Sequence, residues 1–345
     1  MNCLRLSSIP LRVTIVISLF PLGCATTPSN AKVLVPVVET SSPSVQRLQL
    51  RVAPLEIVTS GVRAKAQTDS IVTVKNVDAS PVILQSFKLV GDGLDVFALV
   101  NPLGVSRTLM SGQSAEAVIR FAPGASATVG VHRVTLQIFL AGDDLGPLVD
   151  VAGLVSQGEE GDMEPPLSQV IDALGYHMNV GGPPLVIGTG PALVGDEVLA
   201  PTFVRANPGP VAVDPVARYS PEGSAPYGYF RVDTAPKSKP KLESLGQLAA
   251  TQFQTLNPDA EGEGQISFDP GPAPFGLYVQ SGKKTLFSDA SLNKGPTKHV
   301  TRVFPLKSRN DETIPNAYLV AFEEATNGDY QDYVFVIWNV TAVSP

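Results

Sequence analysis

The sequence predicts an all-β protein in which an immunoglobulin-like sandwich is followed by a second, larger β-sandwich, jelly-roll-like, with one or two short helices. Three observations predict this fold class. The 345 residues include 30 glycines and 31 prolines, which favour turns and short strands over long helices. Short runs alternate apolar and polar residues, which is the period of a strand with one buried face. A polar, acidic run at 157–163 divides the chain into two parts of domain size.

The composition excludes two classes of protein. Charged residues make up 17% of the chain and hydrophobic residues 43%, so the chain can bury cores and is not intrinsically disordered. The formal net charge of −7 lacks the basic surface that a nucleic-acid-binding protein needs. We therefore expect no nucleic-acid partner.

The first residues have the pattern of an export signal. Arg5 and Arg12 accompany an apolar run at 13–20 that is too short for a permanent membrane-spanning helix. The run ends in Pro21-Leu22-Gly23-Cys24, which resembles the cleavage box of bacterial lipoproteins, although Pro21 stands where leucine is usual. The resemblance implies a signal peptide at 1–23, lipidation of Cys24, and a lipid anchor in the membrane of the cell envelope, in the outer membrane or at the cell surface. The alternative is an ordinary secretion signal, with Cys24 as an incidental thiol.

The first domain is predicted at 48–156, after a serine-, threonine- and proline-rich tether at 24–47. It contains about seven short apolar-polar runs separated by turn residues, which is typical of an immunoglobulin-like sandwich. The clearest predicted strands lie at 71–76, 81–89, 117–121 and 132–139. In the last of these the apolar residues are spaced by two, so one face should enter a core.

Motifs in the first domain carry a family resemblance. They are Val74-Lys75-Asn76 with Pro81-Val82, Gly91, Phe97, Ser111-Gly112-Gln113-Ser114, Phe121-Ala122-Pro123 and Val151-Ala152-Gly153. Together they resemble the Hydin-type, or choice-of-anchor D, immunoglobulin-like domain of bacterial surface proteins. The resemblance implies a spacer or protein-interaction module without catalytic residues. His132 has no acid or second histidine near it in the sequence, which favours a structural role.

The second domain, 164–345, follows the linker at 157–163, and few contacts are expected to cross this boundary. An apolar pattern at 167–174, ended by Gly175, predicts a short amphipathic helix. A second short helix is expected within 242–256. The other predicted elements are strands at 203–205, 211–213, 229–232, 265–268, 275–279, 318–322 and 333–337.

The C-terminal half carries a second resemblance. Its motifs, in order, are Phe275-Gly276-Leu277-Tyr278, Phe287-Ser288-Asp289, Leu292-Asn293, His299, Phe322-Glu323-Glu324 and Asn327-Gly328-Asp329-Tyr330-Gln331-Asp332. They resemble a family of bacterial extracellular domains of unassigned function whose ends read Phe-Glu-Asp and then Asp-x-Asp-Tyr-Asn-Asp. Glu324, Asn327 and Gln331 depart from that pattern, and each departure keeps a side-chain oxygen.

The acidic segment near the C-terminus, taken together with this resemblance, favours a calcium site. Calcium takes about six to eight oxygen ligands in flexible geometry, from carboxylates, amides and backbone carbonyls. Gly328 permits a tight turn, and the strands on either side would hold the ends of the loop. Asp289 and Asn293 are further candidate donors from another loop. The alternative is a solvated hairpin turn with ordinary acidic residues. The six predicted ligands are Glu323, Glu324, Asn327, Asp329, Gln331 and Asp332.

Aromatic residues of the second domain allow a glycan as partner, because sugar rings stack on aromatic side chains. The residues are Tyr227, Tyr229, Tyr278, Tyr330 and the single tryptophan, Trp338. The alternative is core packing, since aromatic residues make up only 7% of the chain and are not enriched. The sequence leaves the partner open between a glycan and a surface protein.

The sequence lacks the motifs of common catalytic classes. Removal of the signal peptide and lipidation of Cys24 would leave no free cysteine, and the three histidines lie far apart in the sequence. The sequence also has no zinc-binding helix motif, no nucleophile elbow and no phosphate-binding loop. A glycosidase needs only two carboxylates, and Glu243, Glu261, Glu263 and Asp269 are candidates. We expect a non-catalytic binding or adhesion protein. A polysaccharide-acting hydrolase and a purely structural envelope scaffold are the alternatives.

Overall fold

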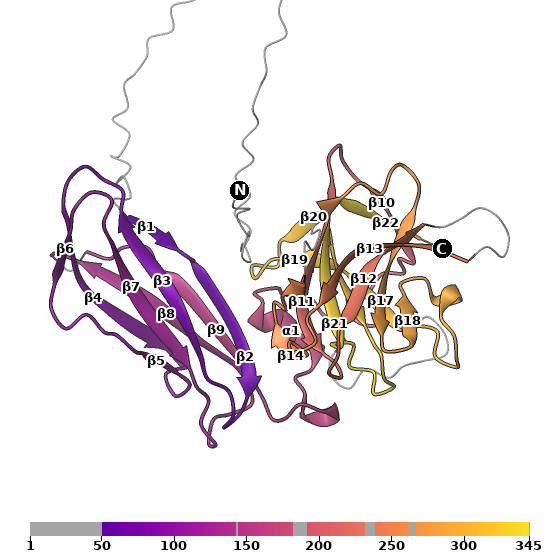
Figure 1. The fold of residues 1–345 in the computed structure, drawn as a ribbon, viewed down its shortest axis with the longest axis horizontal. Helices are drawn as coiled ribbons and strands as arrows, with labels where there is room; N and C mark the ends of the chain where they lie inside the picture. The colour runs from indigo at the N-terminus through magenta and orange to yellow at the C-terminus, as the bar shows by residue number, and fades with distance from the viewer. Residues whose placement is uncertain (1–49, 143, 182–191, 232–238, 262–266, 345) are drawn as a thin grey trace, which may run out of the picture.

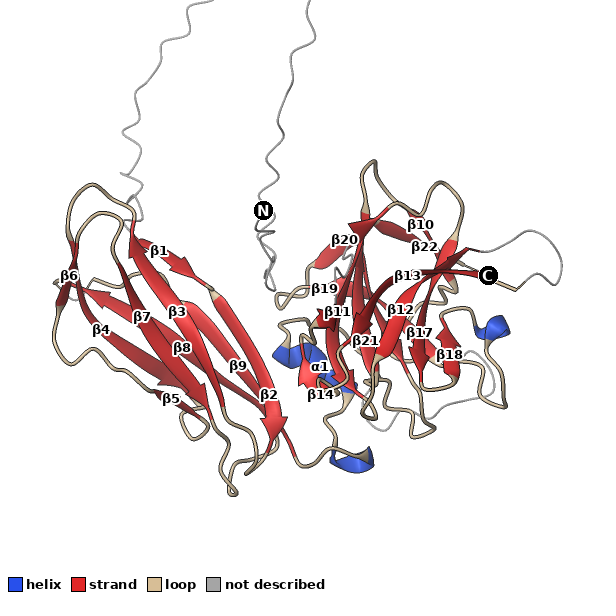
Figure 2. Ribbon diagram, viewed as in Figure 1, coloured by secondary structure: helices blue, strands red, loops and turns tan. Residues whose placement is uncertain are grey.

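The computed structural model describes residues 50–142, 144–181, 192–231, 239–261 and 267–344. The predicted signal peptide, Cys24 and the tether lie outside the described residues. The described part of the chain consists mostly of strands, with one short α-helix and two 3-10 turns (Figures 1 and 2). The predicted all-β fold class is therefore confirmed.

The N-terminal sandwich consists of two sheets. The first has the order β1-β3-β7-β5, with strands Leu50–Ala53, Thr68–Asn76, Ser114–Phe121 and Phe97–Leu99. The second has the order β2-β9-β8-β4-β6, with strands Glu56–Val62, Val149–Ser156, Gly130–Leu140, Val82–Gly91 and Arg107–Leu109. Strand β2 is at one edge of this sheet and pairs in parallel with β9, the strand that leads into the linker.

Alternation along the strands builds the core of this sandwich. In β8, Val134, Leu136 and Ile138 are buried, while the residues between them stay partly exposed, as the sequence predicted. Phe121 of the facing sheet reaches the same core. At Gly153 of β9 a Cβ would lie 2.5 Å from the Phe121 ring, so this glycine lets the two sheets approach closely.

The C-terminal sandwich also has two sheets. The first has the order β15-β13-β12-β17-β10-β22, with strands Ala260–Glu261, Lys241–Leu248, Ala225–Arg231, Phe275–Ser281, Thr202–Arg205 and Val340–Val343, and with β18, Lys284–Phe287, paired to β17. The second has the order β14-β11-β21-β20-β19, with strands Gln254–Leu256, Val211–Tyr219, Tyr333–Trp338, Thr313–Phe322 and Thr301–Lys307, and with β16, Ser267–Phe268, paired to β11.

The second of these sheets is buried on both faces. One face packs against the first sheet, and Tyr333, Phe335 and Ile337 of β21 point into that core. The opposite face carries another apolar cluster, and Val334 and Val336 point into it. This explains why β21 is apolar at every position, because a strand covered on both sides has no solvent-facing residues.

The helix predicted at 167–174 is confirmed. Helix α1 spans Leu167–Ala173, and Gly175 follows it with a φ of 81°. The 3-10 turn η1, Gly161–Met163, precedes it, and η2, Ala290–Leu292, lies in a later loop. No helix of the described residues combines the length and the apolar character needed to cross a membrane.

The helix expected within 242–256 is wrong, because strands β13 and β14 occupy this segment. A bulge explains the misleading pattern. Tyr227 of β12 pairs with Gly246 and Gly228 pairs with Ser244, so Leu245 is an extra residue in β13. Leu245 and Leu248 are both buried although they are three residues apart, which imitates the period of a helix.

The expectation that few contacts cross the linker is also wrong. Leu154 of β9 belongs to the same apolar cluster as α1 and the outer face of the second sheet. Arg133 pairs with Asp172 of α1, with 2.9 Å between Nη2 and Oδ1. The backbone N–H of Leu256 in β14 donates to Oγ of Ser60 in β2, at 3.0 Å. The two sandwiches therefore share an interface, with α1 between them (Figure 1).

Candidate metal centre

The acidic segment forms the loop between β20 and β21. The last paired residues of this hairpin are Phe322 and Tyr333, so Glu323 and Asp332 face each other one position further on. Phe322 and Tyr333 point into the core between the two sheets. Since successive side chains on a strand alternate, Glu323 and Asp332 project to the opposite face, which also carries α1.

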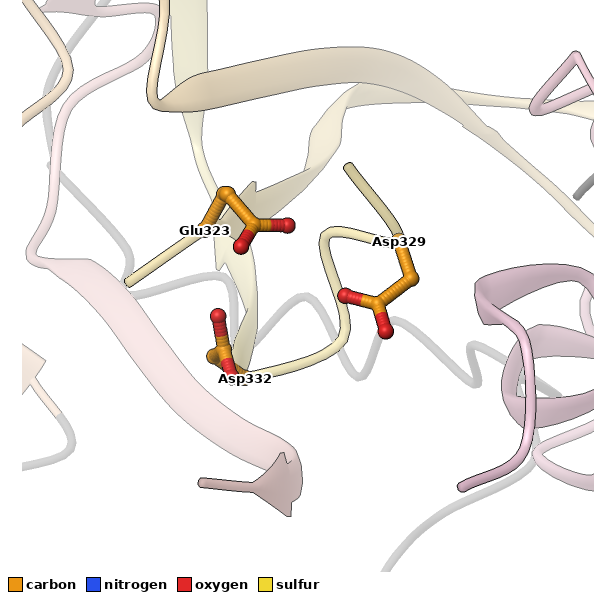
Figure 3. A group of neighbouring side chains, drawn as sticks. All are labelled: Glu323, Asp329 and Asp332. Carbon is orange, nitrogen blue, oxygen red and sulfur yellow. The ribbon is translucent and has the colours of Figure 1, made fainter. Parts of the chain in front are cut away.

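The loop turns back so that Asp329 reaches the same place. Gly328 has a φ of 79° and Tyr330 a φ of 56°, two left-handed residues that reverse the chain. The buried Tyr330 fixes this conformation, because its backbone N–H donates to Glu323 Oε2 at 3.1 Å and its hydroxyl donates to the carbonyl of His299. One carboxylate oxygen from each of Glu323, Asp329 and Asp332 lies within 4.8 Å of the others, and Figure 3 shows the three side chains gathered together.

These three carboxylates are withdrawn from water, and no cationic side chain of the described residues lies paired with them. Glu323 is 0% exposed and Asp332 is 5% exposed, while Asp329 is partly buried. In the part of the chain that the structure describes, no lysine, arginine or histidine forms an ion pair with any of them. Burying ionised carboxylates without compensation costs several kcal/mol for each group. The burial of Glu323 and Asp332 differs from the predicted alternative, a hairpin turn with solvated acidic residues.

Oxygens without a donor make this loop a candidate cation site. Oε1 of Glu323, Oδ1 of Asp329 and Oε1 of Gln331 are buried and accept no hydrogen bond from an N–H or hydroxyl group of the described residues, and the Glu323 and Asp329 carboxyl groups lie close enough to share a proton. Gln331 itself is 1% exposed. Buried acceptors without a donor are rare in folded proteins and call for a proton or an ion. Two carboxylates and an amide with free oxygens, beside the carboxylate of Asp332, match the donor set of calcium.

The electrostatics of the loop agree with this geometry. Burial, followed by the nearby charge of Asp329, raises the pKa of Glu323 to about 7. Burial and the charge of Glu323 raise the pKa of Asp332 well above its ordinary value, and burial also raises the pKa of Asp329. Near neutral pH these groups would share protons unless a cation replaced them.

The other predicted ligands have different positions. The amide of Asn327 is exposed and donates to Asp329 Oδ2. Gln331 Nε2 donates to the same Asp329 oxygen at 2.7 Å and to Glu164 Oε2 at 3.3 Å. Gln331 thus lies at the centre, whereas Asn327 supports Asp329 from outside.

Glu324 points away from the carboxylate group. It follows Glu323 directly, so alternation turns it to the other face of the sheet. There its Oε2 accepts hydrogen bonds from Ser281 Oγ and from the Tyr333 hydroxyl, the latter at 3.3 Å. The prediction that Glu324 belongs with the other five ligands is not supported by this geometry.

Asp289 and Asn293, the further candidates, hold their own loop. Asp289 Oδ1 accepts the backbone N–H of Ser291 at 2.9 Å and caps η2. Asn293 is 4% exposed, accepts from the backbone of Phe287 and donates to the carbonyls of Phe287 and Lys298. Both side chains therefore stabilise the loop that contains them.

Sequence reasoning missed Glu164, which directly follows the linker and contacts Gln331 of this loop. Its Oε1 accepts from Gln254 Nε2 and its Oε2 from Gln331 Nε2. Burial raises the pKa of Glu164 to about 7, and the charge of Asp329 adds to this effect. Its position far from the loop in sequence left no local signal.

The aromatic residues considered for a glycan are mostly core residues. Tyr227, Tyr229, Tyr278 and Tyr330 are exposed by 1%, 7%, 4% and 0%, so their rings have no free face for a sugar. Trp338 is partly buried against the cluster beneath α1. Core packing, the alternative considered, describes these tyrosines.

Candidate catalytic residues are paired with other groups. Glu243 lies 2.6 Å from Lys241 Nζ and Asp269 lies 2.8 Å from Arg205 Nη1. Glu263 and the side chain of Glu261 lie outside the described residues. Each histidine has an acid partner that the sequence did not reveal: His132 with Asp95, His177 with Asp311, and His299 with Glu197.

This chain is distantly similar to several solved structures. No protein family matches the chain, and no curated protein matches it. Among solved structures, the ASH/PapD-like domain of human CEP192 is 13% identical, with a TM-score of 0.27, and covers 38% of this chain and 100% of its own. The secreted serine protease VesC from Vibrio cholerae is 12% identical, with a TM-score of 0.27, covering 86% of this chain and 51% of its own. The calcium binding domain CBD12 of CALX1.1 is 10% identical, with a TM-score of 0.23, covering 67% and 79%.

Proposed function

We propose that this chain is a lipid-anchored, non-catalytic binding or adhesion protein of the bacterial cell envelope, with a calcium ion bound by Glu323, Asp329 and Asp332. One observation carries the calcium assignment. Three carboxylates, two of them enclosed by the fold, lie together with unpartnered oxygens and without a cation of the protein among the described residues. The ion would neutralise the group and tie both ends of the β20–β21 hairpin to its loop.

Calcium suits this site better than magnesium. The donors come from a hairpin neck and a tight loop, and an amide oxygen of Gln331 lies among them. Such a mixed set does not impose the strict octahedron that magnesium requires, and calcium accepts more ligands at longer distances.

Direct titration tests the calcium assignment. Calorimetric titration of the chelator-treated chain with calcium should give one site per chain, and magnesium should bind much more weakly. Asp329→Asn should bind calcium far more weakly than the wild type. Glu116→Gln is a matched control, since this residue lies on β7 of the other sandwich. Absence of calcium binding at millimolar concentration would contradict the assignment.

The burial of the site favours binding over catalysis. A glycosidase needs its two carboxylates open to a sugar ring. Glu323 and Asp332 are enclosed, so an ion fits them and a polysaccharide does not. The tyrosines that suggested a glycan are also enclosed, so we propose a surface protein as the extracellular partner.

The anchor is proposed from the N-terminal motif. Leu22-Gly23-Cys24 after an apolar run, and the resemblance of residues 48–156 to a spacer domain of surface proteins, support a chain held away from the membrane by its first sandwich. Metabolic labelling with a fatty acid should mark the wild type and not Cys24→Ala. Equal labelling of both proteins would remove the anchor from the proposal.

A further inference from the structure

The linker at 157–163 and the adjoining Glu164 form a closed loop between the two sandwiches. The backbone N–H groups of Gln157 and Gly158 both donate to the carbonyl of Met163, at 3.1 and 3.0 Å. The N–H of Glu164 donates to the carbonyl of Gly161 at 3.0 Å. These bonds close the loop on itself and give Glu164 a fixed place just before α1.

Two glutamine amides of the C-terminal sandwich hold the Glu164 carboxylate. Gln254 Nε2 donates to Oε1 and also to the backbone carbonyl of Glu159, the latter at 3.0 Å. Gln331 Nε2 donates to Oε2. Among the described residues, no lysine, arginine or histidine pairs with Glu164, although its side chain is largely withdrawn from water.

Gln331 connects Glu164 to the candidate metal centre. Its Nε2 donates both to Asp329 Oδ2, at 2.7 Å, and to Glu164 Oε2, at 3.3 Å. The Asp329 Oδ2 and Glu164 Oε2 atoms therefore lie at most about 6.0 Å apart, and Glu164 lies beside the group of three carboxylates whose oxygens are within 4.8 Å of one another. Oxygens without partners flank this contact, since Oε1 of Gln331 and Oε1 of Gln254 are both buried and free among the described residues.

We propose that Glu164 is a fourth carboxylate of the calcium site, so that the ion binds the linker as well as the β20–β21 hairpin. This inference rests on the calcium site of the proposed function. It gives that site a further role, because the linker continues directly from β9 of the N-terminal sandwich. Calcium then holds the two sandwiches in one arrangement.

Repulsion between like charges explains why the linker would need the ion to dock firmly against the hairpin. Asp329 repels both Glu164 and Asp162 across the contact between the linker and the hairpin. Without a divalent cation this repulsion weakens the docking of the linker, and with the cation it becomes attraction to a shared centre. The apolar cluster beneath α1 and the pair of Arg133 with Asp172 act in both states.

The test uses Glu164→Gln in the full chain after the signal peptide, with Glu160→Gln as the control. Glu160 is an exposed acid of the same linker whose charge also acts on Glu164, so its variant removes the same charge without removing a proposed ligand. Calorimetry measures calcium affinity, and hydrogen exchange measures the protection of amides at 157–164 in calcium and in chelator.

We expect Glu164→Gln to lower calcium affinity about 10- to 100-fold, while Glu160→Gln changes it less than about threefold. In the wild type, calcium should slow exchange in the linker as well as in the hairpin loop. In Glu164→Gln, saturating calcium should still protect the loop but no longer the linker.

Two results would overturn the inference in different ways. If Glu164→Gln binds calcium as tightly as the wild type and calcium leaves linker exchange unchanged, Glu164 is not part of the site, and the calcium centre of the proposed function remains. If the wild type binds no calcium at all, the proposed function fails and the inference fails with it.

Discussion

The C-terminal sandwich contains two buried acidic groups that differ in one respect. Glu197 is 0% exposed in its side chain and is paired with Arg302 through Nη1 and with His299, whose Nε2 lies 2.7 Å away. Glu323 is equally enclosed, and its neighbours are Asp329 and Asp332. The first group contains its own cations and the second contains none among the described residues.

This difference shows that burial alone does not identify an ion site. A buried carboxylate paired with arginine is complete and acts as structure. A buried carboxylate surrounded by other carboxylates needs a proton or a metal ion to neutralise its charge. Tyr330 lies between the two groups, because its ring stacks on the Arg302 guanidinium, 4.6 Å away, and its N–H donates to Glu323.

The largest expected loss of stability comes from removing the charge of Glu197, the buried acid that is paired with Arg302 and His299. Glu197→Gln leaves the Arg302 charge, 1% exposed, without its carboxylate, and the free energy of unfolding should fall by about 3–5 kcal/mol. The loss should be the same in calcium and in chelator. Denaturant unfolding in both conditions measures it, and a loss confined to calcium would erase the distinction between the two groups.

The next effect should depend entirely on the ion. At a calcium concentration about a hundredfold above Kd, the wild type should gain about 2.7 kcal/mol of unfolding free energy, and Asp332→Asn should lose this gain. In chelator the same variant should be as stable as the wild type or more so, because it removes one of the repelling charges of the group. Thermal unfolding of both proteins in both conditions gives the comparison. A variant that is weakened equally in chelator would indicate a purely structural aspartate.

In chelator, the free energy of unfolding should depend on pH through the buried carboxylates that have no cation beside them among the described residues. Glu323 and Glu164 have a pKa of about 7 in the folded state, above the usual 4.5, so the folded state holds more protons than the unfolded state between these values. The corresponding stability is fully present below about pH 4.5 and is lost as the pH rises through 7. For the enclosed Glu323, the free energy of unfolding should fall by about 1.4 kcal/mol for each pH unit between these two pKa values. Calcium should flatten this decline, since it keeps its ligands ionised. Unfolding curves measured from acid to neutral pH give the slope, and identical slopes in calcium and chelator would contradict the expectation.

The smallest effect is expected at the neighbour of the site. Glu324 lies on the opposite face of the sheet, where it accepts hydrogen bonds from Ser281 and Tyr333. Glu324→Gln should weaken these bonds and lower the free energy of unfolding by about 0.5–1.5 kcal/mol. The calcium-dependent gain in stability should remain that of the wild type. Loss of this gain in Glu324→Gln would return Glu324 to the ligand set.

The sequence predicted more of the fold than of the site. Period-two patterns located strands such as β8 and β21, and the 3.6-residue pattern located α1. The pattern failed at β13, where a bulge at Leu245 changes the period, and pairing with β12 is not visible in a single segment.

For the site, local sequence brought together what lies within one hairpin. Glu323, Asp329, Gln331 and Asp332 were found because they share a loop. Strand alternation could have separated Glu324 from Glu323 beforehand. Glu164 could not be found, since the fold, and not the spacing, places it beside Gln331.

The meeting of β2 and β14 has a consequence for how parts of this protein would behave alone. Each is the edge strand of its sheet, and Leu256 of β14 donates to Ser60 of β2. Open sheet edges offer unpaired backbone groups to other chains and are sites of aggregation. Here each edge shields the other. A fragment beginning at residue 164 would expose β14, and it should self-associate at concentrations at which the full chain stays monodisperse in light scattering.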